Sequence, residues 1–188
     1  MAPPDAVSYA EYLARELASD TKHEYVRGEI LAMSGGTIRH GGITAAFISE
    51  LRTALAGRPC RVFSSDVRVR SAATGFAAYP DLTVVCTRLQ VADDDPHGIG
   101  NPIVVVEVLS DGTEAYDRGA KAAHYRQIPS LREYVLVSQH EPHVEVYRRN
   151  AEDRWELYEW FAGGRLALAS LGVELDVDAL YADPLADG

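Results

Sequence analysis

Glu107 stands where a charged side chain is costly. It interrupts the apolar run from Val104 to Leu109 of this 188-residue chain, and such a continuous run is typical of a strand buried on both faces. A carboxylate buried there costs several kcal/mol unless a metal ion, a cation or a proton compensates it. The other interpretation is a structural ion pair with an arginine of a neighbouring strand.

Asp81 is the second carboxylate of interest. It follows Pro80 at the start of a strand predicted over 79–86. If that strand lies antiparallel to the strand at 102–109, Asp81 and Glu107 converge, and two carboxylates at one point suit a hard divalent cation. Taken alone, Pro80-Asp81 would mark only a turn.

Lys121 is the third candidate. It lies in the helix predicted after the Glu107 strand, among the small residues Ala120, Ala122 and Ala123, which leave room for a long side chain to reach the end of the sheet. Lysine is rare here, because only Lys121 and Lys22 are lysines among 18 cationic residues. An exposed helical lysine without a role is the other interpretation.

The elements that must hold these residues follow from local patterns. Ser8 is expected to cap a helix over 9–17, Arg27-Gly28 to form a hairpin turn, and Thr37 or a neighbour to cap a helix that stops before Gly57. Strands are expected at 60–70, 79–86, 102–109, 133–138, 143–149 and 154–161, a helix at 113–127, and a polar surface loop at 93–98. The order strand, helix, strand over 102–138 makes a βαβ unit with parallel strands. The expected fold class is α/β, a mixed β-sheet flanked by helices.

Charge is distributed unevenly along the chain. The net charge of −10 argues against a generally basic nucleic-acid binder. Residues 151–188 hold nine acids and two arginines, net −7, which leaves −3 for residues 1–150. Residues 39–70 are net +4, with six arginines against Glu50 and Asp66.

Other features limit the class of protein. No stretch approaches the ~20 apolar residues of a membrane span, and the N-terminus lacks the basic start and apolar block of a secretory signal. We therefore expect a cytoplasmic protein without a membrane partner. Cys60 and Cys86 lack CxxC spacing and are interpreted as separate buried thiols in a reducing compartment.

Longer blocks of sequence carry a resemblance. In chain order they are KHEYVRGEILAMSGGTIRHGG, SSDVRVR, YPDLTVV, VVVEVLS and KAAHYRQIPSLREYVLV. Over about residues 8–150 the chain resembles the bacterial Uma family of restriction endonucleases, in the PD-(D/E)xK nuclease superfamily. The resemblance implies a restriction-endonuclease-like mixed sheet flanked by helices, with an extra N-terminal helix and hairpin.

The resemblance also implies roles for the candidate residues. In the superfamily an aspartate and a glutamate bind Mg²⁺ or Mn²⁺, and a lysine orients or activates the attacking water. This implies metal ligation by Asp81 and Glu107. Leu109 occupies the usual lysine position, two residues after the glutamate, so Lys121 is expected to supply the ammonium from the next helix.

Two further residues are supporting candidates. The resemblance suggests a carboxylate near the site, which Glu24 would supply, and the alternative for Glu24 is a surface or structural role. His40 begins a helix after a Gly-rich loop, where it could touch a phosphate. A capping or solvent-facing histidine is the alternative for His40.

The expected function is that of a metal-dependent endonuclease with Mg²⁺ or Mn²⁺ as cofactor and nucleic acid, specifically DNA, as partner. The six arginines of 39–70 are expected to contact phosphates. A non-catalytic interaction module on the same fold is the main alternative, favoured by the net acidity and by Leu109. A third is a metal hydrolase acting on a small phosphoester.

We expect one nuclease-like domain over 1–188. Its expected parts are an N-terminal helix and hairpin (1–35), a core (36–150), and a C-terminal hairpin with an acidic tail (151–188). Edge strands and the aromatic-rich C-terminal hairpin favour a homodimer.

Overall fold

Two six-stranded β-sheets and a two-stranded hairpin form the framework of the protein, whose computed structural model describes residues 6–33 and 35–182. Sheet A contains, in spatial order, β2 (Glu29–Ala32), β1 (His23–Val26), β5 (Phe76–Ala78), β4 (Arg68–Ser71), β8 (Asp95–Ile99) and β7 (Val91–Ala92). Sheet B contains β12 (Trp155–Phe161), β11 (His143–Arg149), β10 (Glu133–Val137), β9 (Val104–Val108), β6 (Leu82–Val85) and β3 (Arg61–Ser64). The separate hairpin pairs β13 (Arg165–Leu168) with β14 (Val173–Asp176).

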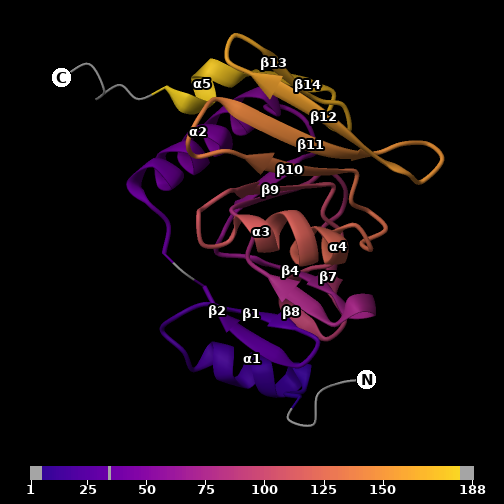
Figure 1. Ribbon diagram of the computed structural model, residues 1–188. Coiled ribbons are helices and arrows are strands. Elements are labelled where there is room, and N and C mark those ends of the chain that lie inside the picture. The colour runs from indigo at the N-terminus through magenta and orange to yellow at the C-terminus, as the bar shows by residue number, and fades with distance from the viewer. Residues whose placement is uncertain (1–5, 34, 183–188) are drawn as a thin grey trace.

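Helices cover both sheets (Figure 1). They are α1 (Tyr9–Leu17), α2 (Ile38–Ala54), the 3₁₀ turn η1 (Ala72–Thr74), α3 (Glu114–Tyr116), the π-helical turn η2 (Asp117–Lys121), α4 (Ala122–Tyr125) and α5 (Val177–Tyr181). Figure 1 places α1 at the sheet A end of the molecule and α2 and α5 at the other end. Among the described residues, no helix combines the length and the apolar character needed to cross a membrane.

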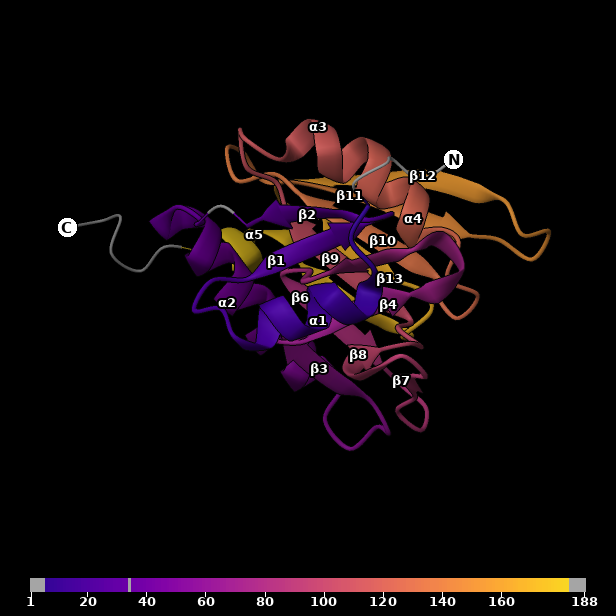
Figure 2. The ribbon, with the colours of Figure 1, turned by 90° about the horizontal axis from the view of Figure 1, so that it is seen from below.

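Three apolar clusters hold these layers together. One face of sheet B packs against α2, the β13–β14 hairpin and α5. The other face packs against α4 and sheet A, and Figure 2 shows α3 and α4 lying along this side. A smaller cluster, which includes Tyr12 and Tyr25, joins α1 to sheet A. Sheet B is therefore covered on both sides at its centre.

The predicted signals at the first elements are confirmed. The Ser8 side chain accepts a hydrogen bond from Glu11 N in a capping box, and Thr37 accepts one from His40 N at the start of α2. Arg27 and Gly28 have φ angles of 50° and 100° at the hairpin turn, the left-handed conformation that a two-residue turn requires. Local sequence determined these boundaries.

The centre of sheet B also agrees with expectation. β9 pairs parallel to β10 and antiparallel to β6, so the βαβ unit and the predicted neighbour of the Glu107 strand are both present. The fold class, an α/β mixed sheet flanked by helices, is confirmed.

The single strand predicted over 60–70 is wrong. It is two strands in different sheets, because β3 pairs with β6 in sheet B and β4 pairs with β5 and β8 in sheet A. Lys22 holds the turn between them by donating to the Ser65 carbonyl and to Asp66. The alternating pattern continued through this turn, so it did not reveal the break.

The surface loop predicted over 93–98 is also wrong. Residues 95–99 form β8, and the Asp95 side chain is fully buried. Arg68 binds both Asp95 oxygens at 2.9 Å, and Tyr9 donates to Asp95 at 2.7 Å. A partner distant in sequence therefore allows this acidic segment to be internal.

Two further expectations need correction. Cys60 and Cys86 form a disulfide, because the register Arg61↔Val85 between β3 and β6 brings the two flanking residues side by side. The segment after 151 is more than one hairpin and a tail, since it contains β12, which pairs with β11, then the β13–β14 hairpin and α5. The end of the predicted acidic tail, 183–188, lies outside the described residues.

Replacing Asp95 is expected to destabilise the fold strongly. Asp95→Asn leaves the buried Arg68 guanidinium without its counter-charge, a loss of about 3–5 kcal/mol in the free energy of unfolding. Asp66→Asn, in the exposed pair with Lys22, is the control and should cost less than about 1 kcal/mol. Urea unfolding measures both, and equal losses would contradict the role given to the Arg68–Asp95 pair.

The same pair predicts a pH dependence. Burial alone would raise the pKa of Asp95, but hydrogen bonds from Arg68 and Tyr9 outweigh it and lower that pKa below its ordinary value. The wild-type stabilisation should therefore be complete above the unfolded-state pKa of about 3.9 and be lost as pH falls below it. Asp95→Asn should show a weaker loss over that range.

Candidate active site

A cavity of about 300 Å³ is lined by all five residues that the sequence analysis proposed for the catalytic and supporting roles. These residues come from five places in the chain: Glu24 from β1, His40 from α2, Asp81 from the segment before β6, Glu107 from β9 and Lys121 from η2. The predicted residues are therefore all brought together.

Asp81 and Glu107 meet through the pairing of β6 with β9. Leu82 is paired with Val106, and continuing this register by one residue places Asp81 opposite Glu107, on one face of the sheet. The Val108 backbone N–H donates to Asp81 Oδ2 at 2.7 Å, which fixes the aspartate at the strand end.

Lys121 lies among three carboxylates. Its Nζ atom is 2.9 Å from Glu24 Oε1, 3.1 Å from Asp117 Oδ1 and 3.2 Å from Glu107 Oε1. Both Asp117 and Lys121 belong to the π-helical turn η2, and such turns occur frequently at functional sites. Lys121 is only 7% exposed, so these contacts form away from solvent.

The charges at the site are not balanced. Burial alone would lower the pKa of Lys121, but Glu107, Glu24 and Asp117 outweigh it and raise that pKa well above its ordinary value. Lys121 is therefore an ammonium that cannot serve as a base at neutral pH. Burial raises the pKa of Glu107, Lys121 lowers it, and the other carboxylates raise it further, with a net increase well above the ordinary value. Four carboxylates and one ammonium line the cavity, and repulsion among the carboxylates is part of what raises the pKa of Glu107.

His40 contacts the other metal-ligand candidate. Its Nε2 atom lies 3.3 Å from Asp81 Oδ2, and the Thr37 cap fixes the first turn of α2 from which it projects. Its interaction with Asp81 is the largest influence on the pKa of His40 and raises it. His40 therefore touches Asp81 instead of facing solvent, which makes it a residue that orients the carboxylate.

Sequence reasoning missed three residues of the site. Asp117 contacts Lys121 from four positions earlier, and that spacing on a helix is a signal that could have identified it. Tyr125 donates to Glu107 Oε1 at 3.1 Å. Tyr116 lines the cavity, and its ring lies 5.4 Å from the Lys121 ammonium. Tyr125 follows Lys121 in the blocks that carry the family resemblance, but the resemblance gave it no role, and nothing in the sequence distinguished Tyr116 from a core residue.

The site's oxygen atoms fit a hard divalent cation. Protein contacts use Oδ2 of Asp81 and Oε1 of Glu107. The other oxygen of each carboxylate, Oδ1 and Oε2, receives no hydrogen bond or ion pair from the described residues. The excess negative charge and these two oxygens match the all-oxygen ligation that Mg²⁺ and Mn²⁺ prefer.

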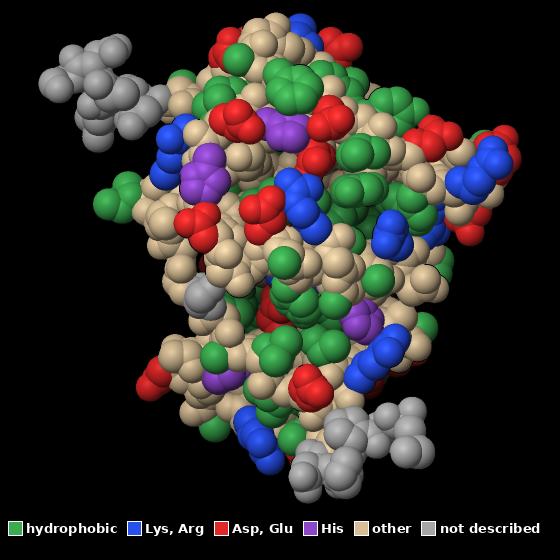
Figure 3. Space-filling model, viewed as in Figure 1, with side chains coloured by type: hydrophobic (Ala, Val, Ile, Leu, Met, Phe, Trp, Pro, Cys, Tyr) green, Lys and Arg blue, Asp and Glu red, His purple; other side chains and the backbone are tan. Residues whose placement is uncertain are grey.

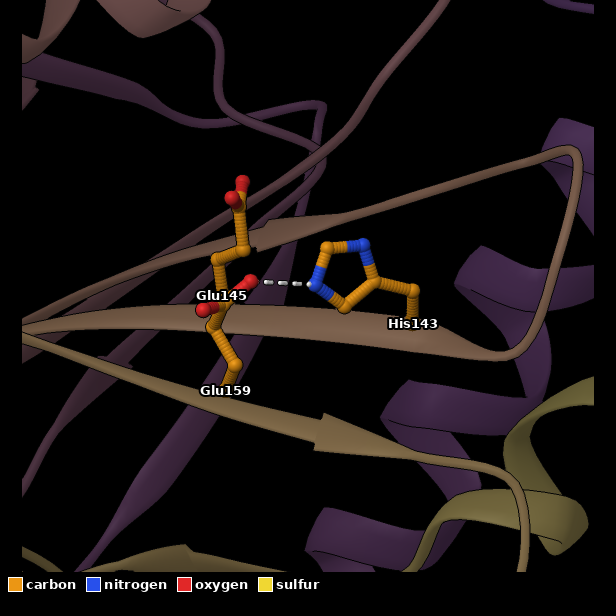
Figure 4. A group of neighbouring side chains, drawn as sticks. All are labelled: His143, Glu145 and Glu159. Carbon is orange, nitrogen blue, oxygen red and sulfur yellow. Dashed lines mark hydrogen bonds and ion pairs between the residues drawn. The ribbon is translucent and has the colours of Figure 1, made fainter.

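A second group of donor atoms lies elsewhere, on β11 and β12 (Figure 4). His143, Glu145 and Glu159 place three donor atoms within 4.8 Å of one another. His143 Nε2 contacts Glu159 at 3.0 Å, and Arg118 contacts Glu145. Because both carboxylates are already matched by protein groups, we interpret this group as structural contacts of β11 with β12 and with η2.

The expectation for the six arginines of 39–70 is partly wrong. Arg68 and Arg70 are buried and paired with Asp95 and Asp94, so they cannot contact phosphates. The face shown in Figure 3 mixes acidic, basic and apolar side chains and presents no continuous basic surface. The four remaining arginines are exposed.

Sequence comparison identifies the family of the protein. Residues 9–180 match the profile of Uma2, described as “Putative restriction endonuclease”. The chain belongs to the Uma2 family. Two uncharacterized proteins of Synechocystis sp. are relatives: one is 36% identical over 96% of this chain and 94% of its own length. The other is 33% identical over 80% of this chain and 85% of its own length.

Comparison of folds agrees with the family. A crystal structure described as “a putative nuclease belonging to DUF820”, from Anabaena variabilis, matches with a TM-score of 0.74. The match has 18% sequence identity and covers 93% of this chain and 97% of that one. The Uma2 family and this nuclease-like fold agree with the resemblance found in the sequence blocks and support a nuclease.

Removing the site ammonium should destabilise the protein far more than removing the other lysine. Lys121→Gln leaves three buried carboxylates without their shared cation and should cost about 3 kcal/mol or more in the free energy of unfolding. Lys22→Gln breaks contacts with Asp66 and the Ser65 carbonyl at a surface turn and should cost about 1 kcal/mol. Urea unfolding in EDTA measures both, and similar losses would contradict the contacts described for Lys121.

Proposed function

We propose that this Uma2-family protein is a metal-dependent endonuclease that hydrolyses phosphodiester bonds of DNA, in the manner of PD-(D/E)xK nucleases. The observation that carries the proposal is the convergence of Asp81, Glu107 and Lys121 at one cavity, from three separate elements. The family and the fold support a nuclease, and the residues of the cavity support the specific mechanism proposed.

In this mechanism Asp81 and Glu107 would hold Mg²⁺ or Mn²⁺. Such an ion, when bound, stabilises charge that develops on the phosphate and lowers the pKa of a water molecule. The reaction forms a bond from a water oxygen to phosphorus and breaks the bond to the leaving ester oxygen. That oxygen is protonated as it leaves, and the water loses a proton to solvent.

The chain's own residues position these groups. Lys121 acts as a fixed positive charge beside the reacting phosphate, because its neighbouring carboxylates keep it protonated. The Val108 N–H and His40 orient Asp81, and Tyr125 orients Glu107. Leu109, at the usual lysine position, is buried, which agrees with an ammonium supplied from η2 instead.

Substitutions at the three residues test the proposal. Asp81→Asn, Glu107→Gln and Lys121→Met should each reduce Mn²⁺-dependent cleavage of supercoiled plasmid by at least about 100-fold. Glu159→Gln, which removes a carboxylate of the group in Figure 4, is the control and should keep wild-type cleavage. Cleavage that persists in all three site variants would refute the proposal.

Calorimetry with Mn²⁺ distinguishes the main alternative, a non-catalytic interaction module. The nuclease proposal requires wild-type protein to bind Mn²⁺ and Asp81→Asn to lose that binding. A chain that binds no Mn²⁺ and cleaves no DNA would favour the interaction module.

His40 is expected to contribute less than Asp81. His40→Ala removes the group that orients Asp81 Oδ2 and should weaken Mn²⁺ affinity by about 10–100-fold, as is usual for residues that support metal ligands. His140→Ala is a matched control, because His140 pairs with Asp111 on the surface. Calorimetry on both variants measures the difference, and equal affinities would assign His40 no supporting role.

A homodimer remains a prediction. β12 is an outermost strand of sheet B, and Leu157 and Phe161 on it are 47% and 56% exposed. An unpaired edge with apolar side chains is a surface that a second copy would cover. Sedimentation equilibrium at several concentrations decides between monomer and dimer.

A further inference from the structure

Four arginines gather at the end of β6 that lies away from Asp81. Arg58 and Arg61 flank Cys60, Arg88 follows Cys86, and Arg52 lies in the last turn of α2. We call this group, Arg52, Arg58, Arg61 and Arg88, the arginine surface. The disulfide between Cys60 and Cys86 joins the two segments that carry three of its members.

Two adjoining hollows shape the arginine surface. One, of about 580 Å³, is lined by Arg58, Arg61 and Arg88. The other, of about 350 Å³, is lined by Arg52, Arg58 and Arg61. Phe63 lines both and gives them an apolar wall. The two hollows therefore form one concave region around Cys60.

The charge of this region is uncompensated within the described part of the chain. No aspartate or glutamate lines either hollow, although the chain has 28 acidic residues against 18 cationic ones. Arg58 donates to the carbonyl oxygens of Leu171 and Gly172, which are neutral and leave its charge in place. Such a concentration of positive charge on an acidic protein attracts anions locally.

We propose that the arginine surface binds the phosphate backbone of a nucleic acid, apart from the bond that is cut. Guanidinium groups bind phosphate oxygens through paired hydrogen bonds, for which arginine is better suited than lysine. The choice of nucleic acid among polyanions rests on the proposed function. The surface would anchor the substrate and add affinity that the acidic cavity cannot provide.

The spacing is compatible with one substrate reaching both places. Asp81 and Cys86 are separated by the length of β6, about 16 Å at 3.3 Å per residue. Duplex DNA carries one charge per ~1.7 Å of its axis, so this distance corresponds to about ten phosphates.

Binding in EDTA tests the proposal without cleavage. Fluorescence anisotropy with a labelled duplex of about 24 base pairs gives the affinity at several salt concentrations. The double variant Arg61→Gln, Arg88→Gln should bind about tenfold more weakly at low salt, and its log–log salt slope should be smaller by about 1.8. Both residues are exposed, so folding should be unaffected, which thermal unfolding checks.

A charge-matched control separates local contacts from net charge. Arg15→Gln, Arg132→Gln removes two exposed arginines that line neither hollow and should keep the wild-type slope. Equal losses in the two double variants would overturn the proposal. So would wild-type protein that binds no duplex, or that binds polyglutamate more tightly than duplex, because the surface would then suit an acidic protein segment.

The outcome is independent of catalysis. Should the Arg61 and Arg88 variant bind duplex more weakly than the control while no form of the protein cleaves DNA, the arginine surface is supported and the nuclease proposal fails. Should cleavage occur while the Arg61 and Arg88 variant binds like the control, the nuclease proposal stands and the arginine surface is overturned.

Discussion

The Lys121 ammonium lies within 3.2 Å of carboxylates from three elements, Glu24 on β1, Glu107 on β9 and Asp117 on η2. These contacts hold sheet A, sheet B and the helix between β9 and β10 in one arrangement. A buried charge without a partner costs several kcal/mol, so none of these elements can move away without a large penalty. The cavity keeps its shape for this reason.

The same contacts leave the site with more carboxylates than cationic groups. One ammonium faces Glu24, Glu107 and Asp117, and Asp81 adds a further carboxylate at the strand end. Protein donors hold one oxygen of Asp81 and one of Glu107, and the second oxygen of each remains for a ligand. A divalent cation at these two oxygens would offset part of that excess negative charge, which supports the proposed metal-dependent hydrolysis.

Charge is arranged differently in the rest of the molecule. Arg68 and Asp95 neutralise each other inside sheet A, where both are buried. Because of this pairing, Asp95 lies in strand β8, although the sequence pattern predicted a polar surface loop over 93–98. The arginine surface has the opposite property, because no acid of the described residues lines its two hollows. The net charge of −10 therefore describes neither the interior nor that surface.

The sequence by itself determined the local features: the caps at Ser8 and Thr37, the turn at Arg27, and the buried character of the strand around Glu107. Each of these features depends only on residues nearby in the chain. Asp81 and Lys121 were predicted because a buried carboxylate such as Glu107 requires a metal ion or a cation, and because the sequence blocks resemble a nuclease family. Tertiary structure alone decided the contact of Tyr125 with Glu107, the break between β3 and β4, the burial of Asp95 and the Cys60–Cys86 disulfide. These depend on partners distant in the chain, and hydrophobic periodicity does not record which strand lies beside which.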